Sequence, residues 1–255
     1  MKIGKQTQPR TAISTSDADS ITVRGHDLCR DLVGKMSFTA YFHLLLTGKS
    51  ASTAQIAVLD ACLVAIAEHG LVPSVVASRM TLAAAPDAMQ GAVAAGLLGC
   101  GSVILGASQD AGRLLLEVEA RMASQADPVP AVRSVLREWH AARRAIPGYG
   151  HPLHKEGDPR VLRLFKVATE QGTGQRYIAL ARTIENEIEG VTGKALKLNV
   201  SAAIPAVLLG AEFPSEALRG VPLLARTAGL IAHLVEEVSD PIGFSLAHHA
   251  TRDVG

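Results

Sequence analysis

The chain has 255 residues, of which 48% are apolar and 19% are charged, so it can bury a large core and its composition excludes intrinsic disorder. Lysine and arginine number 25 against 24 aspartate and glutamate, and aromatic residues make up 4%, which argues against binding of nucleic acid or of an anionic membrane. Three scattered cysteines (Cys29, Cys62 and Cys100) and the lack of an apolar leader predict reduced thiols in a cytoplasmic protein without a metal site.

Helical periodicity dominates the first half of the chain. The first twenty residues are polar and are expected to be loose, and residues 21–24 are predicted as a short strand that Gly25 ends. Residues 38–46 are predicted as a helix that stops at Gly48, and N-cap side chains at 50–53 open a second helix that runs to His69-Gly70. Further helices are predicted at 74–84, 88–104, 108–125 and 129–144.

Residues 88–109 carry no charged side chain, which raises the question of a membrane span. The stretch contains five glycines together with Gln90 and Ser102, and these residues lower its hydrophobicity. We therefore predict a buried helix with close backbone contacts, and no membrane association.

The helical pattern breaks within residues 146–154, where two prolines and two glycines fall within six residues. It resumes after Pro159, again over 175–189, and once more over 215–238, where Gly220 and Pro222 are expected to separate a short helix from a longer one. No alternation of period two persists for more than a few residues. The predicted fold class is all-α, with about ten helices.

The loop at residues 146–160, IPGYGHPLHKEGDPR, is the candidate functional segment. It brings together four side chains that can be cationic, namely His151, His154, Lys155 and Arg160, which suits a polyanionic ligand. A surface turn with solvated charges remains the alternative on these residues alone. Phosphate-loop, dinucleotide-binding, zinc-protease and serine-hydrolase motifs are absent from the sequence.

The same loop resembles the signature of the citrate synthase superfamily, in which a G-[FYI]-G-H is followed nine residues later by the arginine of a D-P-R. Residues 21–52 are similar to the family's R-G-Y…D-L block and its F…L-L-x-G helix. Residues 67–74 (AEHGLVPS) are similar to its D-H-G-x-x-x-S segment, and residues 221–237 are similar to its A-R-T-x-G-x-I-A-H helix. Within the family the chain looks most like the citryl-CoA lyase branch and the lyase module of ATP-citrate lyase.

This resemblance implies an all-α, citrate synthase-like multi-helical fold in a single domain over residues 1–255. It also implies an active cleft between a large subdomain, at about 1–107 and 213–255, and a small subdomain, at about 108–212. The family builds its cleft beside a helical subunit interface, so a homodimer or higher homo-oligomer is expected.

The resemblance also implies roles for single residues. His69 matches a histidine that hydrogen-bonds oxaloacetate or citrate, and His151 matches the histidine that donates to the oxygen on the carbon where the bond forms or breaks. Arg160 and Arg226 match the two arginines that hold substrate carboxylates, a task that suits the bidentate guanidinium group. Lys155 lies where a basic side chain meets the phosphates of coenzyme A, which enters as a thioester substrate, and no metal is expected.

Two positions depart from the family pattern. Ile104 stands where the synthases have a histidine that polarises the thioester carbonyl, and isoleucine cannot donate a hydrogen bond. Ser201 stands where the family has its catalytic aspartate, and a serine hydroxyl is a poor base near neutral pH. Ser201 could hold a water molecule, or Glu185 or Glu187 could approach as a substitute carboxylate.

The resemblance, together with these departures, predicts cleavage of citryl-CoA, or of a similar 3-hydroxy-carboxylated acyl-CoA, into acetyl-CoA and a 2-oxo acid by retro-aldol chemistry. Two alternatives stay open: condensation of acetyl-CoA with oxaloacetate, as in citrate synthase, and a catalytically silent acyl-CoA-binding homologue. The other histidines, His233 among them, are expected to be structural or on the surface, and Glu236-Glu237 is expected to be a solvated helix end.

Overall fold

The computed structural model describes residues 10–101, 105–122, 126–150 and 157–254. The chain forms two compact units, residues 1–56 (unit 1) and 57–255 (unit 2), and the boundary falls within helix α2, Thr53–Ala67. The structure is mostly helical, which confirms the predicted fold class. The division into a large and a small subdomain stays a prediction.

Unit 1 combines a small antiparallel sheet with one long helix. The strands lie in the order β1 (Ser14–Ser16), β2 (Ile21–Val23) and β3 (His26–Asp27), and a short helical turn, η1 (Leu28–Leu32), follows them. Helix α1, Phe38–Thr47, begins at Ser37, whose side chain accepts from the backbone N–H of Ala40, and ends at Gly48 in the left-handed conformation. The predicted strand at 21–24 and the predicted stop at Gly48 are both confirmed.

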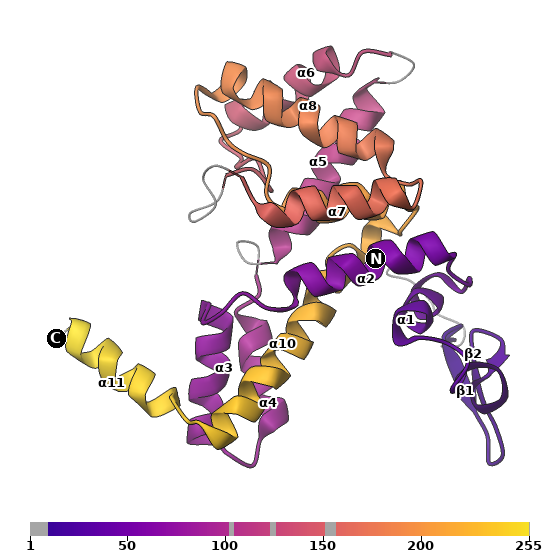
Figure 1. The fold of residues 1–255 in the computed structure, drawn as a ribbon, viewed down its shortest axis with the longest axis vertical. Helices are drawn as coiled ribbons and strands as arrows, with labels where there is room; N and C mark the ends of the chain where they lie inside the picture. The colour runs from indigo at the N-terminus through magenta and orange to yellow at the C-terminus, as the bar shows by residue number, and fades with distance from the viewer. Residues whose placement is uncertain (1–9, 102–104, 123–125, 151–156, 255) are drawn as a thin grey trace, which may run out of the picture. The chain divides into compact units, whose positions relative to one another are not determined.

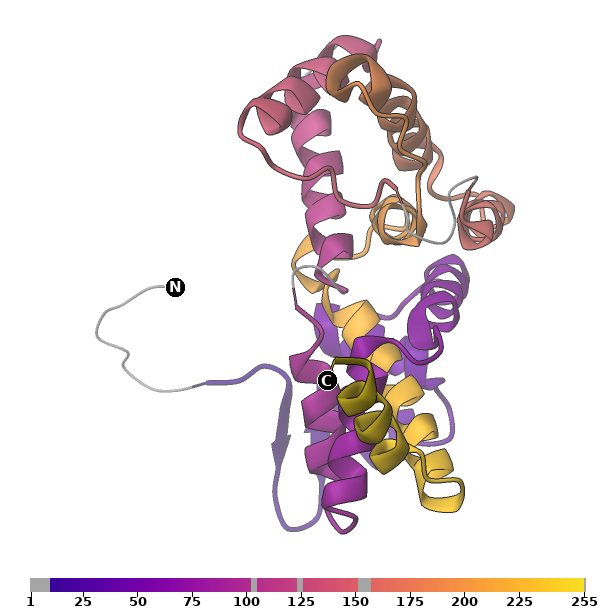
Figure 2. The ribbon, with the colours of Figure 1, turned by 90° about the vertical axis from the view of Figure 1, so that its left-hand side faces the viewer.

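In unit 2, a first group of helices packs around α3. It comprises α3 (Pro73–Ala84), α4 (Met89–Leu98), α10 (Gly220–Ser239) and α11 (Gly243–Val254). Helix α3 contacts the other three, and α4 also contacts α10; α3, α4 and α10 lie side by side in both views (Figures 1 and 2). Leu82, Ala92 and Leu234 form a shared core between α3, α4 and α10.

A second group of helices in unit 2 surrounds α9. It comprises α5 (Gly106–Met122), α6 (Val129–Ala141), α7 (Pro159–Glu170), α8 (Gln175–Thr192) and α9 (Val200–Gly210). Helix α9 contacts α5, α7 and α8, and its residues 202–209 are all buried. A short turn, η2 (Ser215–Ala217), precedes α10. Helix α9 is therefore the core helix of this group.

The uncharged stretch at 88–109 does not form one helix. Helix α4 ends at Leu98 and α5 begins at Gly106, so the predicted helix over 88–104 is too long. Within the described residues, Ser215–Ser239 is long and apolar enough to cross a membrane by length and composition alone. Of its apolar 18-residue window 44% is buried within the fold, and a single match of this kind is weak grounds for a membrane span.

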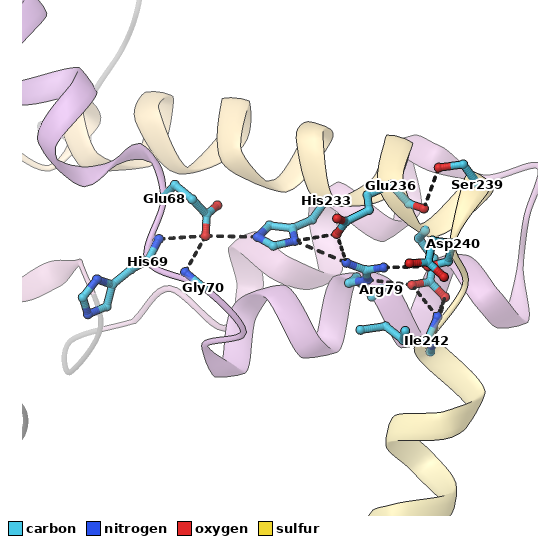
Figure 3. A network of polar contacts seen from close by, with 11 residues as sticks. Glu68, His69, Gly70, Arg79, His233, Glu236, Ser239, Asp240 and Ile242 are labelled. Atoms are coloured by element: carbon cyan, nitrogen blue, oxygen red, sulfur yellow. Dashed lines mark hydrogen bonds and ion pairs between the residues drawn. The ribbon is translucent and has the colours of Figure 1, made fainter.

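A buried ion pair joins α3 to the α10–α11 junction. Arg79 donates from Nε to Glu237 Oε2 at 2.6 Å and from Nη2 to the Asp240 carbonyl at 3.0 Å (Figure 3). Glu237 also accepts the backbone N–H of Gly243 at 2.7 Å. Burial alone would raise the pKa of Glu237, but the Arg79 guanidinium and these backbone donors lower it, so the group is a carboxylate. The expectation of a solvated end at 236–237 is wrong for Glu237, whose buried charge has a buried partner.

Candidate active site

The segment that precedes the predicted catalytic loop is fixed to the start of α9. Asn199 donates its backbone N–H to the Gly148 carbonyl at 2.9 Å and its side-chain amide to the Gly150 carbonyl at 2.6 Å, and Gly150 N–H donates to the Lys197 carbonyl at 2.6 Å. Gly148 has a φ of +84°, and a Cβ atom there would lie 2.7 Å from the backbone nitrogen of Ala202. Only glycine allows this approach, so residues 148–150 pack closely against the start of α9 and are joined to it by hydrogen bonds.

The segment that follows the loop is fixed to the same place by Asp158. This buried carboxylate is the N-cap of α7, where its Oδ1 accepts the backbone N–H of Arg160 at 3.1 Å and its Nε–H at 2.9 Å. Its Oδ2 accepts from Arg160 Nη2 at 2.8 Å and from the backbone N–H of Val200, at the start of α9, at 3.0 Å. Burial would raise the pKa of Asp158, but Arg160 and the Val200 N–H outweigh it and lower the pKa, so the group is ionised.

The segments before and after the predicted catalytic loop are therefore both fixed to the first turn of α9, the first through Gly150 and the second through Asp158. His151 and Lys155, the predicted catalytic and coenzyme A-binding residues of the loop, lie outside the described residues, and so does Ile104. Arg160 is among the described residues. Its Nε and Nη2 donate to Asp158, and these two bonds orient the guanidinium group. Its Nη1 makes no hydrogen bond within the described part of the chain.

Ser201 lies in the first turn of α9, half-buried, with its backbone N–H donated to Asn199 Oδ1 at 2.8 Å. Its hydroxyl makes no hydrogen bond to any described residue. The two glutamates considered as substitutes have other partners: Glu185 accepts the backbone N–H of Leu198 at 2.9 Å, and Glu187 pairs with Arg133. No described carboxylate is hydrogen-bonded to Ser201, whose position at the positive end of a helix favours a negatively charged or polar ligand atom.

Arg226 is a buried cation without a counter-charge in the described residues. It lies on α10 with 3% of its surface exposed, and its Nη2 donates to the Ile66 carbonyl at 3.5 Å. Its Nε and Nη1 are buried and have no hydrogen-bond partner there. Buried guanidinium N–H groups without acceptors are unfavourable by themselves, and the carboxylate oxygens of a ligand are acceptors that suit them.

Cys100 lies close to Arg226 and to a second arginine, Arg219. Arg219 Nη2 donates to the Cys100 carbonyl at 3.4 Å. Burial raises the pKa of the Cys100 thiol, while the hydroxyl of Ser74 and the charges of Arg226 and Arg219 oppose that shift. The thiol is thus protonated at neutral pH, and the positive charge of this region is free to act on an anionic ligand.

His69 lies in the exposed turn after α2, and its ring points away from the neighbouring Glu68 (Figure 3). Its segment contacts α10 directly: Arg226 bonds to the Ile66 carbonyl, and a Cβ atom at Gly229 would lie 2.2 Å from the Ala67 carbonyl oxygen. The structure thus brings the segment of His69 against the helix of Arg226, and brings Arg160 and Ser201 together at the start of α9.

Sequence reasoning missed Asp158 and Asn199, which hold this site together. Both are N-cap residues, of α7 and α9, and Asp158 is followed by proline at the first helical position. An Asp-Pro or Asn before an apolar run is a recognisable signal for a helix start, and that signal could have identified both residues. Within the described residues there is no group of three or more His, Cys, Asp or Glu side chains that could hold a metal ion.

Residues 32–243 match the family model of the citrate synthase C-terminal domain. Among curated proteins, a citrate synthase from Synechocystis sp. is 27% identical over 211 residues, which cover 80% of this chain and 51% of that protein. The chain spans about half the length of the curated relatives it matches.

Two solved structures are also similar. Citryl-CoA lyase from Hydrogenobacter thermophilus superimposes with a TM-score of 0.79 at 31% identity, over 91% of this chain and 87% of that one. ATP citrate lyase from Methanothrix soehngenii, solved in complex with citrate and coenzyme A, has a TM-score of 0.75 at 24% identity, over 93% of this chain and 40% of that one. The second likeness is one of fold alone.

Proposed function

The chain belongs to the citrate synthase family, and from this premise we propose that it cleaves citryl-CoA, or a similar 3-hydroxy-carboxylated acyl-CoA, into acetyl-CoA and a 2-oxo acid. The observation that carries the proposal is Arg226, a buried guanidinium group with two N–H donors that have no acceptor in the described part of the chain. A substrate that carries carboxylates supplies those acceptors. The likeness to a citryl-CoA lyase over most of both chains supports the choice of reaction.

The proposed reaction is a retro-aldol cleavage. A base removes the proton of the 3-hydroxyl group, the C–O bond becomes a carbonyl, and the bond between C2 and C3 breaks. The electron pair passes into the thioester enolate, which takes up a proton to give acetyl-CoA, while the other half leaves as oxaloacetate when citryl-CoA is the substrate. This direction requires a base at a hydroxyl group rather than at the methyl group of acetyl-CoA.

Each candidate residue has a role in this proposal. His151 hydrogen-bonds the oxygen that becomes the ketone, and His69, Arg160 and Arg226 hold carboxylates. Lys155 meets the phosphates of coenzyme A. Ser201, whose hydroxyl is unbonded within the described residues, holds the water molecule that takes up the hydroxyl proton.

Particular residues bear on the two alternative functions. Condensation, as in the curated citrate synthases, is disfavoured by Ile104, which cannot polarise a thioester carbonyl. A silent acyl-CoA-binding homologue is favoured by Ser201, because no described carboxylate is bonded to it as a base. The active form in our proposal is a homo-oligomer, which exposed apolar side chains along α10 support.

The deciding experiment supplies citryl-CoA and follows oxaloacetate release in a coupled assay with NADH-dependent malate dehydrogenase. We expect turnover by the wild-type protein and at least a hundredfold loss in His151→Ala. Tight binding of citryl-CoA without turnover would replace the lyase by a silent binding protein. Net citrate formation from acetyl-CoA and oxaloacetate, with no cleavage of citryl-CoA, would replace it by a synthase.

A further inference from the structure

The turn that carries His69 is held by a single carboxylate oxygen. Glu68 Oε1 accepts the backbone N–H of His69 at 2.8 Å and that of Gly70 at 2.5 Å, and it lies 3.0 Å from Nε2 of His233 on α10 (Figure 3). Burial alone would raise the pKa of Glu68, but the contact with His233 and the two backbone donors lower it. The carboxylate is therefore ionised and accepts from three donors.

His233 in turn faces two charged groups through its other ring nitrogen. Nδ1 lies 3.5 Å from Nη1 of Arg79 and 3.8 Å from Oε2 of Glu236, and Arg79 Nη1 is itself ion-paired to Glu236. In the tautomer that carries its proton on Nε2, the ring donates to Glu68 and accepts from Arg79. The chain of contacts thus runs from the buried Arg79 of α3 to the backbone at His69.

One face of α10 meets the residues that lead into this turn. Arg226, Gly229 and His233 are spaced by three and four positions, so they lie on the same side of the helix. They meet, in order, the Ile66 carbonyl, the Ala67 carbonyl and the Glu68 carboxylate. The face that carries Arg226, whose Nε and Nη1 have no hydrogen-bond partner in the described part of the chain, therefore also fixes the backbone of His69.

We propose that Glu68 and His233 are positioning residues, which fix the turn at His69-Gly70 against α10 so that the His69 ring and the Arg226 guanidinium group converge on one carboxylate ligand. This inference rests on the proposed function, because it takes His69 and Arg226 as carboxylate-binding groups. The Glu68 side chain is 48% exposed, so its contacts order a surface turn rather than support the core.

The test compares His233→Leu, which removes the donor to Glu68, with His233→Gln, whose side-chain amide can still donate. In His233→Leu we expect amide hydrogen exchange at residues 69 and 70 to rise about tenfold and the Kd for citrate and oxaloacetate to rise about tenfold, with an unchanged Kd for coenzyme A. Glu68→Gln keeps an acceptor oxygen but loses the charge, so we expect a smaller change in the same direction, about threefold. His233→Gln restores both readouts to within about twofold of wild type.

The matched control is His249→Leu, because His249 is an exposed histidine on α11 that hydrogen-bonds to Ser245, one turn earlier on the same helix. It is expected to change neither readout. If the wild-type protein binds citrate or oxaloacetate and His233→Leu and Glu68→Gln bind it equally well, the positioning role is overturned while the proposed function stands. If the wild-type protein binds neither acid, the proposed function fails and this inference fails with it.

Discussion

Arg226 carries a positive charge into the interior of unit 2, where its Nε and Nη1 have no hydrogen-bond partner among the described residues. This lack has opposite consequences for the stability of the ligand-free protein and for the binding of a ligand. A buried charge without a partner is destabilising, and its replacement by an apolar side chain of similar length can stabilise a fold. A residue retained for a ligand is therefore expected to lower the stability of the ligand-free protein.

In Arg226→Met we expect the free energy of unfolding, measured by urea denaturation without ligand, to rise by about 1 kcal/mol. We also expect the affinity for citrate, measured by calorimetry, to fall by at least about a hundredfold, since a buried charge-assisted contact is lost. Arg137→Met, at an exposed arginine of α6, is the control and should change neither quantity appreciably. A destabilised Arg226→Met that keeps its citrate affinity would show that the guanidinium group is structural.

Asp158 has the opposite character, because its partners in the described part of the chain are hydrogen-bond donors and its charge is satisfied within the fold. Its pKa is lowered in the folded state, so it contributes stability that is present above its unfolded pKa of about 4 and is lost as the pH falls through the folded value. Acid should therefore weaken the contact between the start of α7 and the start of α9, which the Asp158 carboxylate makes.

Asp158→Asn replaces one of the two accepting carboxylate oxygens by an NH₂ group, which cannot accept a hydrogen bond from Arg160 or Val200. We expect this change to lower the free energy of unfolding by about 2 kcal/mol at pH 7. The difference from wild type should shrink below about pH 4, because the wild-type carboxyl group becomes protonated there. Urea denaturation at a series of pH values measures both effects. Asp110→Asn, at an exposed ion pair with Arg113, should change stability by less than about 0.5 kcal/mol at either pH. An equal loss at both ends of the pH range would contradict the role of the charge.

Among the helices, those with one apolar face could be predicted from the sequence, and those without one could not. The expected helices at 74–84, 129–144 and 175–189 match α3, α6 and α8 to within a few residues. Helix α9 was not predicted, because it is buried on all sides, has no polar face to give a period, and contains Pro205. Helix α4 was predicted six residues too long, since apolar composition alone does not show where a helix ends.

The close contact between Gly148 and α9 gives a prediction about how these two segments pack. Gly148→Ala combines a left-handed backbone with a Cβ atom 2.7 Å from the Ala202 nitrogen, and we expect it to lower the free energy of unfolding by about 3 kcal/mol. Gly172→Ala is the matched control: its φ is +70° but nothing lies within 4 Å of the added Cβ, so it should lose only about 1 kcal/mol. Equal losses in the two variants would show that the contact between residue 148 and α9 does not form in solution.

At the scale of the whole chain, the family could be identified from short blocks that are far apart in the sequence, and the fold followed from that identification. The structure brings two of these blocks together, since Arg226 and His233 of α10 contact residues 66 and 68. Which distant partner each side chain would meet could not be predicted, because the bond from the Val200 N–H to Asp158 and the contact between His233 and Glu68 depend on tertiary packing. The roles of His151, Lys155 and Ile104 stay predictions from the resemblance.

Exposed side chains on α10 give the prediction that concerns assembly. Ile231, Val235 and Val238 are 42%, 57% and 71% exposed, and their spacing of four and three positions places them on one face of the helix. A second copy of the chain that covers this stripe would remove apolar surface from water, so we expect a dimer or larger assembly by light scattering at micromolar concentration.

Val235→Glu should shift the protein toward the monomer, because it would bury an unpaired charge. Leu162→Glu, at an exposed apolar position on α7, should leave the mass unchanged. A wild-type protein that stays monomeric would contradict the homo-oligomer.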